Sequence, residues 1–406
     1  MAWLTVVLFL LGFVLLIGGA EVLVRGASRM AGVLGVPPLI VGLTVVSFGT
    51  SSPELAVSAG AALKANGEVA LGNAIGSNVC NVLLILGASA LVAPLIVQNK
   101  LIRRDVPVML GVAVVPLLIG LDGVIGMTDG VLLLAGLAAY LLFLFFAARS
   151  GDEAALGVAE LSHASGRPGA PAEGAGGREQ GQGQGQGRGR VLAVSAGFVV
   201  AGLVLLVIGS DWLVDGAVSI ATAFGVSQTV ISLTVVAFGT SLPELAACVS
   251  AAWKGERDIA VGNVVGSNIF NVLGILGVAG VLSAKGGVIV SSSMLYFDIP
   301  VMIAVCLACI PVFVTGGQIA RWEGGLFVAY YAAYVLYLVL DAVGHAALGP
   351  YSNVLFYFVV PLTGVTLSVL LAGTIRRKVK VGRRRRRRLA AAESSPGGDA
   401  AGESGG

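Results

Sequence analysis

Charge is scarce in this sequence. Only 12% of its 406 residues are charged, whereas 56% are hydrophobic and the mean hydropathy is +0.94. A typical soluble domain carries about 25% charged residues. Apolar runs of about 20 residues are long enough to cross the hydrocarbon core of a membrane as helices. The shortage of charge therefore excludes a soluble globular protein and predicts an all-α, multi-pass membrane protein.

Histidine and cysteine are also rare. The two histidines, His163 and His345, lie in polar segments between apolar runs, so no serine has a suitable general base. This argues against an intramembrane hydrolase and predicts that the protein is not an enzyme. The four cysteines lie inside apolar runs and predict no disulfide framework. Cys306 and Cys309 form a C-x-x-C without other ligand residues, so helix packing is their expected role and no cofactor is predicted.

What the chain does contain is a long internal repeat. The stretch 43–87 returns without a gap at 233–277, shifted by 190 residues, and 27 of the 45 aligned positions are identical. The identities include every conspicuous polar residue of the stretch. Core packing tolerates exchanges among apolar residues and does not insist on polar ones. The duplicated polar set therefore predicts a functional role for both motifs.

The repeat extends beyond these motifs. Upstream, Gly19-x-Glu21 matches Gly209-x-Asp211, and downstream a D-x-P-V-M pattern occurs twice, at 105–109 and at 298–302. We therefore expect two copies of one five-helix unit. The predicted segments are a first repeat at 1–148, a linker at 149–190, a second repeat at 191–341, an additional transmembrane helix at 352–374 and a basic tail at 375–406. The predicted repeat helices are 3–24, 37–64, 69–93, 105–121 and 127–148, then 191–213, 227–254, 259–283, 295–315 and 323–341.

Five helices is an odd number, so the two copies must cross the membrane in opposite senses. With the N-terminus outside, only Lys64 and Lys285 of the 25 basic residues face outward. We expect the protein to lie in the plasma membrane. The positive-inside rule then predicts that the linker and the C-terminus are cytoplasmic. Inverted-topology repeats are typical of transporters, whose site lies at the repeat interface near the midplane.

The linker and the tail have compositions that do not predict folded domains. The linker is rich in Gly, Gln and Arg, so it cannot bury a core and is expected to be disordered. The tail carries ten basic residues between Arg376 and Arg388. We expect it to anchor the topology, with binding of anionic lipid headgroups as the alternative. No accompanying domain suggests a nucleic-acid partner.

Each motif contains a proline where a helix should break. Pro53 has no N–H and clashes with the carbonyl four residues earlier, which frees backbone carbonyls near Gly49 and Thr50. Glu54 lies about one turn beyond Thr50, and Glu244 holds the same place in the second motif. A carboxylate in mid-membrane is costly and by default functional. Two broken helices that offer carboxylates, hydroxyls and carbonyls supply hard oxygen ligands, which suit calcium and sodium.

The helix after each break carries polar residues spaced by four, which places them on one face. They are Asn73, Ser77 and Asn81 in the first repeat, and Asn263, Ser267 and Asn271 in the second. Other acidic residues have structural explanations. We expect an ion pair between Glu21 and Arg25, and helix capping by Asp105 and Asp298 and by Asp129 and Glu323 at helix starts.

The doubled G-T-S-x-P-E-L and G-S-N-x-x-N motifs resemble those of the sodium/calcium exchanger family, bacterial type, within the cation/calcium antiporter superfamily. The resemblance covers about 1–341. It implies ten core helices, calcium exchanged for sodium, and alternating access by sliding of the first helix of each repeat. It also implies a set of ion ligands. These are Thr50, Ser51, Glu54, Ser77 and Asn81, their counterparts Thr240, Ser241, Glu244, Ser267 and Asn271, and the carbonyls of Ser47 and Ala237.

Two alternatives remain open from the sequence. An empty site would hold two repelling carboxylates, so protons could replace sodium as the counter-ion. Broken helices also fit a cation channel, although inverted repeats favour alternating access. The chain departs from the family pattern because asparagine stands at both position 81 and position 271, where many members have one aspartate. This departure bears on sodium stoichiometry and potassium dependence.

Overall fold

The computed structural model describes residues 2–149, 184–225, 237–283, 286–314 and 317–355, with five single residues beyond them (Tyr357, Pro361, Gly364, Val365 and Ser368). The basic tail, most of the linker and most of the additional helix at 352–374 lie outside the described residues, as does the first part of the predicted helix at 227–254.

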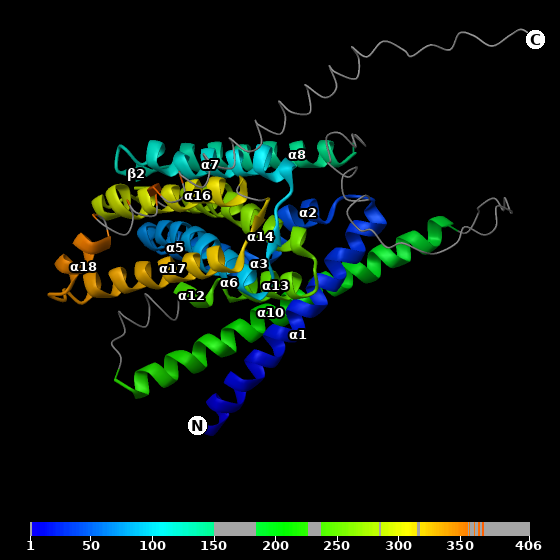
Figure 1. Ribbon diagram of the computed structural model, residues 1–406, viewed down its shortest axis with the longest axis horizontal. Coiled ribbons are helices and arrows are strands. Elements are labelled where there is room, and N and C mark those ends of the chain that lie inside the picture. The colour runs from blue at the N-terminus through cyan, green and yellow to red at the C-terminus, as the bar shows by residue number, and fades with distance from the viewer. Residues whose placement is uncertain are drawn as a thin grey trace, which may run out of the picture.

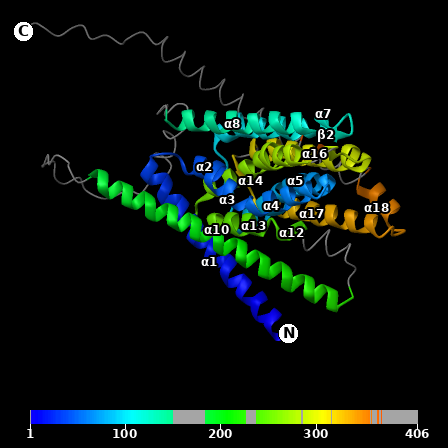
Figure 2. The ribbon, with the colours of Figure 1, turned by 180° about the vertical axis from the view of Figure 1, so that it is seen from behind.

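Two long helices lie together along one side of the molecule. They are α1 (Ala2–Leu34) and α10 (Gln184–Ala223), which cross each other in both views (Figures 1 and 2). Their contact is a seam of small residues at intervals of seven. A Cβ on Gly12, Gly19 or Gly26 would meet the backbone carbonyl oxygen of Gly209, Gly202 or Ser195 at 2.9 Å in each case. Small residues at this spacing let two helix backbones approach closely.

The predicted break at Pro53 is present. The span that precedes it consists of α2 (Pro38–Val41), a π-helical stretch η1 (Gly42–Val46) and α3 (Ser47–Thr50). The span then continues as α4 (Ser52–Leu63), bent by 46° from the first part. The described part of the second copy is α12 (Ala237–Gly239) followed by α13 (Leu242–Trp253).

Two continuous helical spans form the centre of the fold. One is α5 (Gly67–Cys80), η2 (Asn81–Leu86) and α6 (Gly87–Val92), and the other is α14 (Arg257–Phe270), η6 (Asn271–Leu276) and α15 (Gly277–Leu282). In the most apolar part of these two spans, 72% and 89% of the residues are buried, against 28% and 22% in α1 and α10. In both central spans the π-helical stretch begins at the second asparagine of G-S-N-x-x-N. Single π-turns inside helices are frequent at functional sites.

The remaining helices pack beside these spans. They are η3 (Leu101–Asp105) with α7 (Val106–Ile119), α8 (Met127–Arg149), η7 (Met294–Asp298) with α16 (Ile299–Val314), α17 (Arg321–Ala342) and α18 (Leu348–Val354). In Figure 1, α7, α8 and α16 lie above α5 and α14, on the side opposite to α1 and α10.

Four two-residue strands join the copies. Antiparallel pairing connects β1 (Leu95–Ile96) to β4 (Gln318–Ile319), with Leu95 opposite Ile319, and β2 (Val124–Ile125) to β3 (Val288–Ile289), with Val124 opposite Ile289. β1 precedes α7 and β2 follows it, and β3 precedes α16 and β4 follows it. The two strand pairs therefore connect both ends of α7 to the ends of α16 in the other copy.

The fold confirms an all-α membrane protein. Within the described residues, seven helices are long and apolar enough to cross a membrane, or eight if the bent pair around Pro53 counts as one span. The sequence predicts ten helices and an additional one. The difference has local reasons. The span formed by η3 and α7 is long enough to cross a membrane, but it carries three charged residues, Arg103, Arg104 and Asp105, near its start and is therefore not among the seven. Parts of two other predicted helices lie outside the described residues.

Candidate ion-binding site

The helix breaks place a carboxylate at the start of a new helix in each copy. Ser51 and Ser241 stand at the breaks, and Glu54 and Glu244 follow in the first turns of α4 and α13. Their side chains are buried, with only 1% and 2% of their surface exposed. A carboxylate at this end of a helix is stabilised by the positive end of the helix dipole. The broken helices therefore place the carboxylates of Glu54 and Glu244 inside the protein, away from solvent.

The two breaks contact each other through a crossed pair of hydrogen bonds. The Ser51 hydroxyl donates to Glu244 Oε1 at 2.9 Å, and the Ser241 hydroxyl donates to Glu54 Oε1 at 3.0 Å. Each serine thus serves the carboxylate of the other copy. The arrangement brings both carboxylates, from residues 190 apart in the chain, to one place inside the fold.

The central helices add hydroxyl and amide groups beside the carboxylates. The Ser51 hydroxyl lies 3.1 Å from Ser267 Oγ on α14. The Thr50 hydroxyl lies 3.0 Å from the Val46 carbonyl oxygen and 3.3 Å from Asn263 Oδ1. Thr240, the counterpart of Thr50, is half-buried, whereas Asn81 and Asn271 are 1% exposed.

Several oxygens of this cluster are buried and accept no hydrogen bond from the described residues. They are one oxygen of each glutamate, Glu54 Oε2 and Glu244 Oε2, together with Ser77 Oγ, Asn81 Oδ1 and Asn271 Oδ1. A buried polar atom without a partner costs about 1–3 kcal/mol. Native proteins keep few such atoms, and each needs an explanation. These five oxygens, from two carboxylates, two amides and a hydroxyl, are of the kind that coordinates a hard cation.

The freed carbonyls are less open than the sequence suggests. The Ser47 carbonyl oxygen accepts the Ser51 N–H at 3.0 Å, and the Thr50 hydroxyl lies 3.4 Å from the same oxygen, so an ion would compete with the hydroxyl for the second lone pair. The Gly239 carbonyl oxygen at the second break accepts the hydroxyl of Ser210 on α10 at 2.7 Å. Sequence reasoning missed Ser210, although a buried serine in an apolar span is itself a signal. Ala237 lies in α12 just before this break.

Sequence reasoning also missed Asn78 and Asn268, the asparagines within G-S-N. Asn81 Nδ2 donates to Asn268 Oδ1 at 3.2 Å, and Asn271 Nδ2 donates to Asn78 Oδ1 at 3.1 Å. Both are 1% exposed. Their presence in both copies of the motif could have identified them, but they do not lie on the helix face that carries the polar residues spaced by four. Asn73, which does lie on that face, contacts the backbone just after the helix break, because its Nδ2 lies 3.0 Å from the Glu54 carbonyl oxygen.

The other acidic residues lie outside this cluster. Glu21 pairs with Arg25 as predicted, and its Oε1 also lies 3.6 Å from Lys254 Nζ. Partial burial lowers the pKa of Lys254, and the charge of Glu21 opposes that shift. Asp129 and Glu323 confirm the predicted capping, since they accept the N–H groups of Gly126 and Ala320 at 2.9 and 2.8 Å.

The capping prediction for Asp105 and Asp298 is wrong. The helices begin earlier, in the π-helical stretches η3 and η7, so both residues already lie within helical backbone. Neither makes a side-chain capping bond. Asp105 accepts two bonds from Arg104 at 2.8 and 3.1 Å, and Asp298 Oδ1 accepts the Tyr334 hydroxyl at 3.2 Å.

Crossed broken helices with two buried carboxylates and several buried oxygens without partners define a membrane protein with a candidate cation site. A family model described as sodium/calcium exchanger protein matches residues 4–146 and 194–340. The chain belongs to the sodium/calcium exchanger family.

Individual relatives agree with the family match. Sodium/calcium exchanger MaX1 of Methanosarcina acetivorans is 34% identical over 354 residues, which cover 82% of this chain and 97% of MaX1. Inner membrane protein YrbG of Escherichia coli is 38% identical over 276 residues, 68% of this chain and 79% of YrbG. Among solved structures, the sodium-calcium exchanger NCX_Mj matches with a TM-score of 0.67 at 31% identity, covering 83% of this chain and 99% of that one.

Proposed function

We propose that the protein is a secondary active antiporter that exchanges calcium for sodium by alternating access. The observation that carries this proposal is the crossed cluster, in which Ser51 and Ser241 bind one oxygen of each glutamate and leave the other oxygen of each without a partner. MaX1 and NCX_Mj, which are named sodium/calcium exchangers, support the choice of ions. The family consists of transporters, and we assign no catalytic residue.

Charge balance explains why two ions would exclude each other. Glu54 and Glu244 supply two negative charges, which one calcium ion or two sodium ions neutralise. Both ions favour oxygen ligands, and calcium takes 6–8 of them. Since the same two carboxylates would bind either one calcium ion or two sodium ions, binding of one kind of cation would prevent binding of the other. Mutual exclusion at one site is the physical basis of antiport.

The proposed ligands are the side chains of both motifs and two backbone carbonyls. The side chains are those of Thr50, Ser51, Glu54, Ser77, Asn81, Thr240, Ser241, Glu244, Ser267 and Asn271, and the carbonyls are those of Ser47 and Ala237. Asparagine at both position 81 and position 271 leaves the glutamates as the only charged members of this set. No resident cofactor is part of the proposal.

The proposed topology follows from the repeats. Two five-helix units at 1–148 and 191–341 would cross the plasma membrane in opposite senses, with the N-terminus outside. The linker at 149–190 and the tail at 375–406 would then be cytoplasmic, where the tail's arginines would anchor the topology, with binding of anionic lipid headgroups as the alternative. Cysteine accessibility to an impermeant reagent on intact cells tests this, since the Lys64 loop should react from outside and the linker should not.

Calcium uptake into proteoliposomes tests the function. Vesicles loaded with sodium are compared with vesicles that carry only a pH gradient, and with vesicles that carry neither. Uptake driven by sodium alone supports the proposal. Uptake driven only by protons would replace sodium by protons as the counter-ion on the same site. Uptake without saturation and at high rate would instead indicate a channel.

A further inference from the structure

An asparagine that binds a cation must present the correct end of its amide. The oxygen end attracts a cation and the NH₂ end repels it, yet the two ends have nearly the same shape. Asn81 and Asn271 each have a buried Oδ1 without a partner, while their NH₂ groups are held by Asn268 and Asn78. The orientation of these two amides therefore depends on the orientation of the two behind them.

The surroundings of Asn78 determine which way its amide points. Its Nδ2 lies 3.3 Å from the backbone carbonyl oxygen of Asn268 and 3.3 Å from the Met302 sulfur. A carbonyl oxygen and a thioether only accept hydrogen bonds, so the end of Asn78 that faces them must be the NH₂ group. Its Oδ1 must then face Asn271, which in turn can offer only its own NH₂ group. The oxygen of Asn271 is left for the cation.

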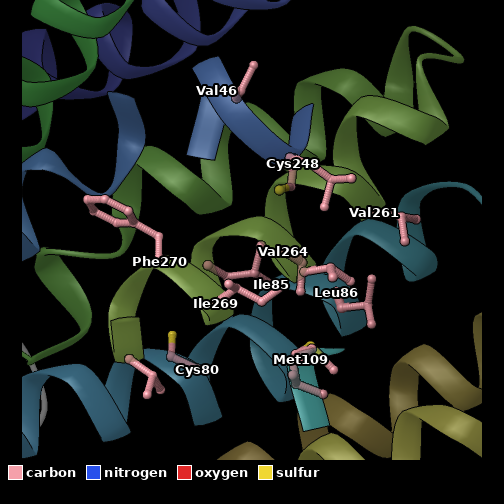
Figure 3. Packing of buried hydrophobic residues seen from close by; sticks show 14 of the residues in the cluster. Val46, Cys80, Ile85, Leu86, Met109, Cys248, Val261, Val264, Ile269 and Phe270 are labelled. Atoms are coloured by element: carbon pink, nitrogen blue, oxygen red, sulfur yellow. The ribbon is translucent and has the colours of Figure 1, made fainter. Parts of the chain in front are cut away.

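A matching chain of contacts orients Asn81. Asn268 Nδ2 lies 3.5 Å from the Met109 sulfur, so Asn268 Oδ1 faces Asn81 and accepts from its NH₂ group. Met109 and Met302 both close the doubled D-x-P-V-M pattern, for which the ion ligands give no explanation. They are 1% and 0% exposed, and Met109 belongs to the buried apolar cluster drawn in Figure 3.

We propose that Asn78 and Asn268, backed by Met302 and Met109, are positioning residues that fix the amide oxygens of Asn271 and Asn81 toward the transported cation. Each series of hydrogen bonds starts at groups that can only accept and ends at the Oδ1 atom of Asn271 or Asn81. Each also crosses between the repeats, so the second repeat's ligand is oriented by the first repeat's asparagine, and the reverse. The inference rests on the proposed function, because it assumes that a cation occupies the oxygen cluster.

The two chains differ in strength. Asn78 Nδ2 faces a backbone carbonyl as well as a sulfur, whereas the described contact of Asn268 Nδ2 is with the Met109 sulfur alone. A thioether is a weak acceptor. We therefore expect Met109→Leu to disturb its chain more than Met302→Leu, although both substitutions conserve volume and apolar character.

The decisive experiment is a double-mutant cycle between Asn78 and Asn271. Asn78→Ala releases the amide of Asn271, and we expect the apparent KM for calcium to rise by about 10- to 100-fold, the usual effect of losing a residue that orients a metal ligand. The maximal rate should change much less. A carboxylate has two equivalent oxygens and needs no orientation. In an Asn271→Asp background, Asn78→Ala should therefore raise the KM by less than twofold, or lower it, since an acceptor facing the carboxylate is removed.

Equilibrium calcium binding to the purified protein in detergent provides a second readout, which does not depend on sodium coupling. If wild-type vesicles show no sodium-driven uptake while the binding cycle shows the expected coupling, the sodium coupling of the proposed function fails, and the cation site on which the inference rests stands. Ser89→Ala is the matched control, because Ser89 is a fully buried serine on α6 that belongs to neither chain. It should leave calcium affinity unchanged.

Two results would overturn the inference. One is an equal effect of Asn78→Ala on calcium affinity in the wild-type and Asn271→Asp backgrounds, which is what a purely structural role predicts. The other is an unchanged KM in Asn78→Ala. If Asn78→Ala does not yield folded protein, the methionine pair decides, and equal calcium affinities in Met109→Leu, Met302→Leu and wild type count against the inference.

Discussion

Two adjacent glycines on α1 allow a sharp test of how the two long helices are held together. A Cβ on Gly19 would lie 2.8 Å from the Leu206 nitrogen and 2.9 Å from the Gly202 carbonyl oxygen, both of them backbone atoms of α10. A Cβ on Gly18 would meet nothing within 4 Å. The substitutions Gly19→Ala and Gly18→Ala therefore add the same methyl group to the same helix in opposite environments.

The expected magnitudes follow from these distances. Ordinary contact needs 3.4–4 Å, so Gly19→Ala must separate the α1 and α10 backbones by several tenths of an ångström. Overpacking of this kind costs about 1–3 kcal/mol. Gly18→Ala gains helix propensity of up to about 1 kcal/mol instead. The two variants should thus differ in stability by about 1–4 kcal/mol, with Gly18→Ala at or above wild type.

Thermal unfolding of the detergent-purified protein measures this difference. We expect Gly19→Ala to lower Tm by several degrees and Gly18→Ala to leave it unchanged or raise it slightly. The same ranking should hold for Gly202→Ala on the partner helix, whose Cβ would lie 2.5 Å from the Leu23 nitrogen. Equal Tm values for Gly18→Ala and Gly19→Ala would show that the glycine seam does not hold α1 against α10.

Three further predictions concern the ion site and the long helices. Replacing both Glu54 and Glu244 by glutamine should abolish coupled exchange in proteoliposomes, and persistent sodium-driven calcium uptake in that double variant would refute the site. Ser210→Ala should lower the unfolding free energy by about 1–3 kcal/mol, because it leaves a buried carbonyl unpaired; an unchanged Tm would contradict this. Cysteines that replace Lys64 and Asp211 should cross-link only under ion gradients that favour the state opposite to the one described here, in which Glu21 lies near Lys254. Equal cross-linking under all gradients would argue against a change of state.

The sequence predicts the break and its carboxylates well because the determinants are local. Pro53 cannot stand inside a continuous helix without breaking or kinking it, so a new helix begins just before it, and Glu54 follows it directly; both features are visible in a short stretch. Glu21, Arg25 and Asp129 are local cases too, since each interacts with a residue three or four positions away. These predictions needed no knowledge of how the helices pack.

The predictions that failed depend on packing or on backbone register. Asp105 looks like a capping residue before a proline, but a π-helical stretch begins four residues earlier and removes the need for a cap. Nothing in local propensity marks where such a stretch begins. Asn78 and Met302 lie 224 residues apart and meet only because the two repeats interlock. The two-residue strands that join the repeats are likewise too short to leave a pattern.

Comparison of the two copies indicates which part of the molecule changes between states. The serine–glutamate contacts occur in both senses, since Ser51 reaches Glu244 as Ser241 reaches Glu54, although Ser267 contacts Ser51 while its counterpart Ser77 has a hydroxyl without a partner. The contacts of the long helices do not. Glu21 on α1 lies 3.6 Å from Lys254, while the corresponding acid and lysine, at positions 211 and 64, form no ion pair within the described residues. Both copies keep an acid and a lysine at these positions, so the sequence permits either pair. In inverted repeats the state that opens one side is the mirror of the state that opens the other. We therefore expect the Glu21–Lys254 contact to exchange with one between positions 211 and 64, which predicts that α1 and α10 move between states.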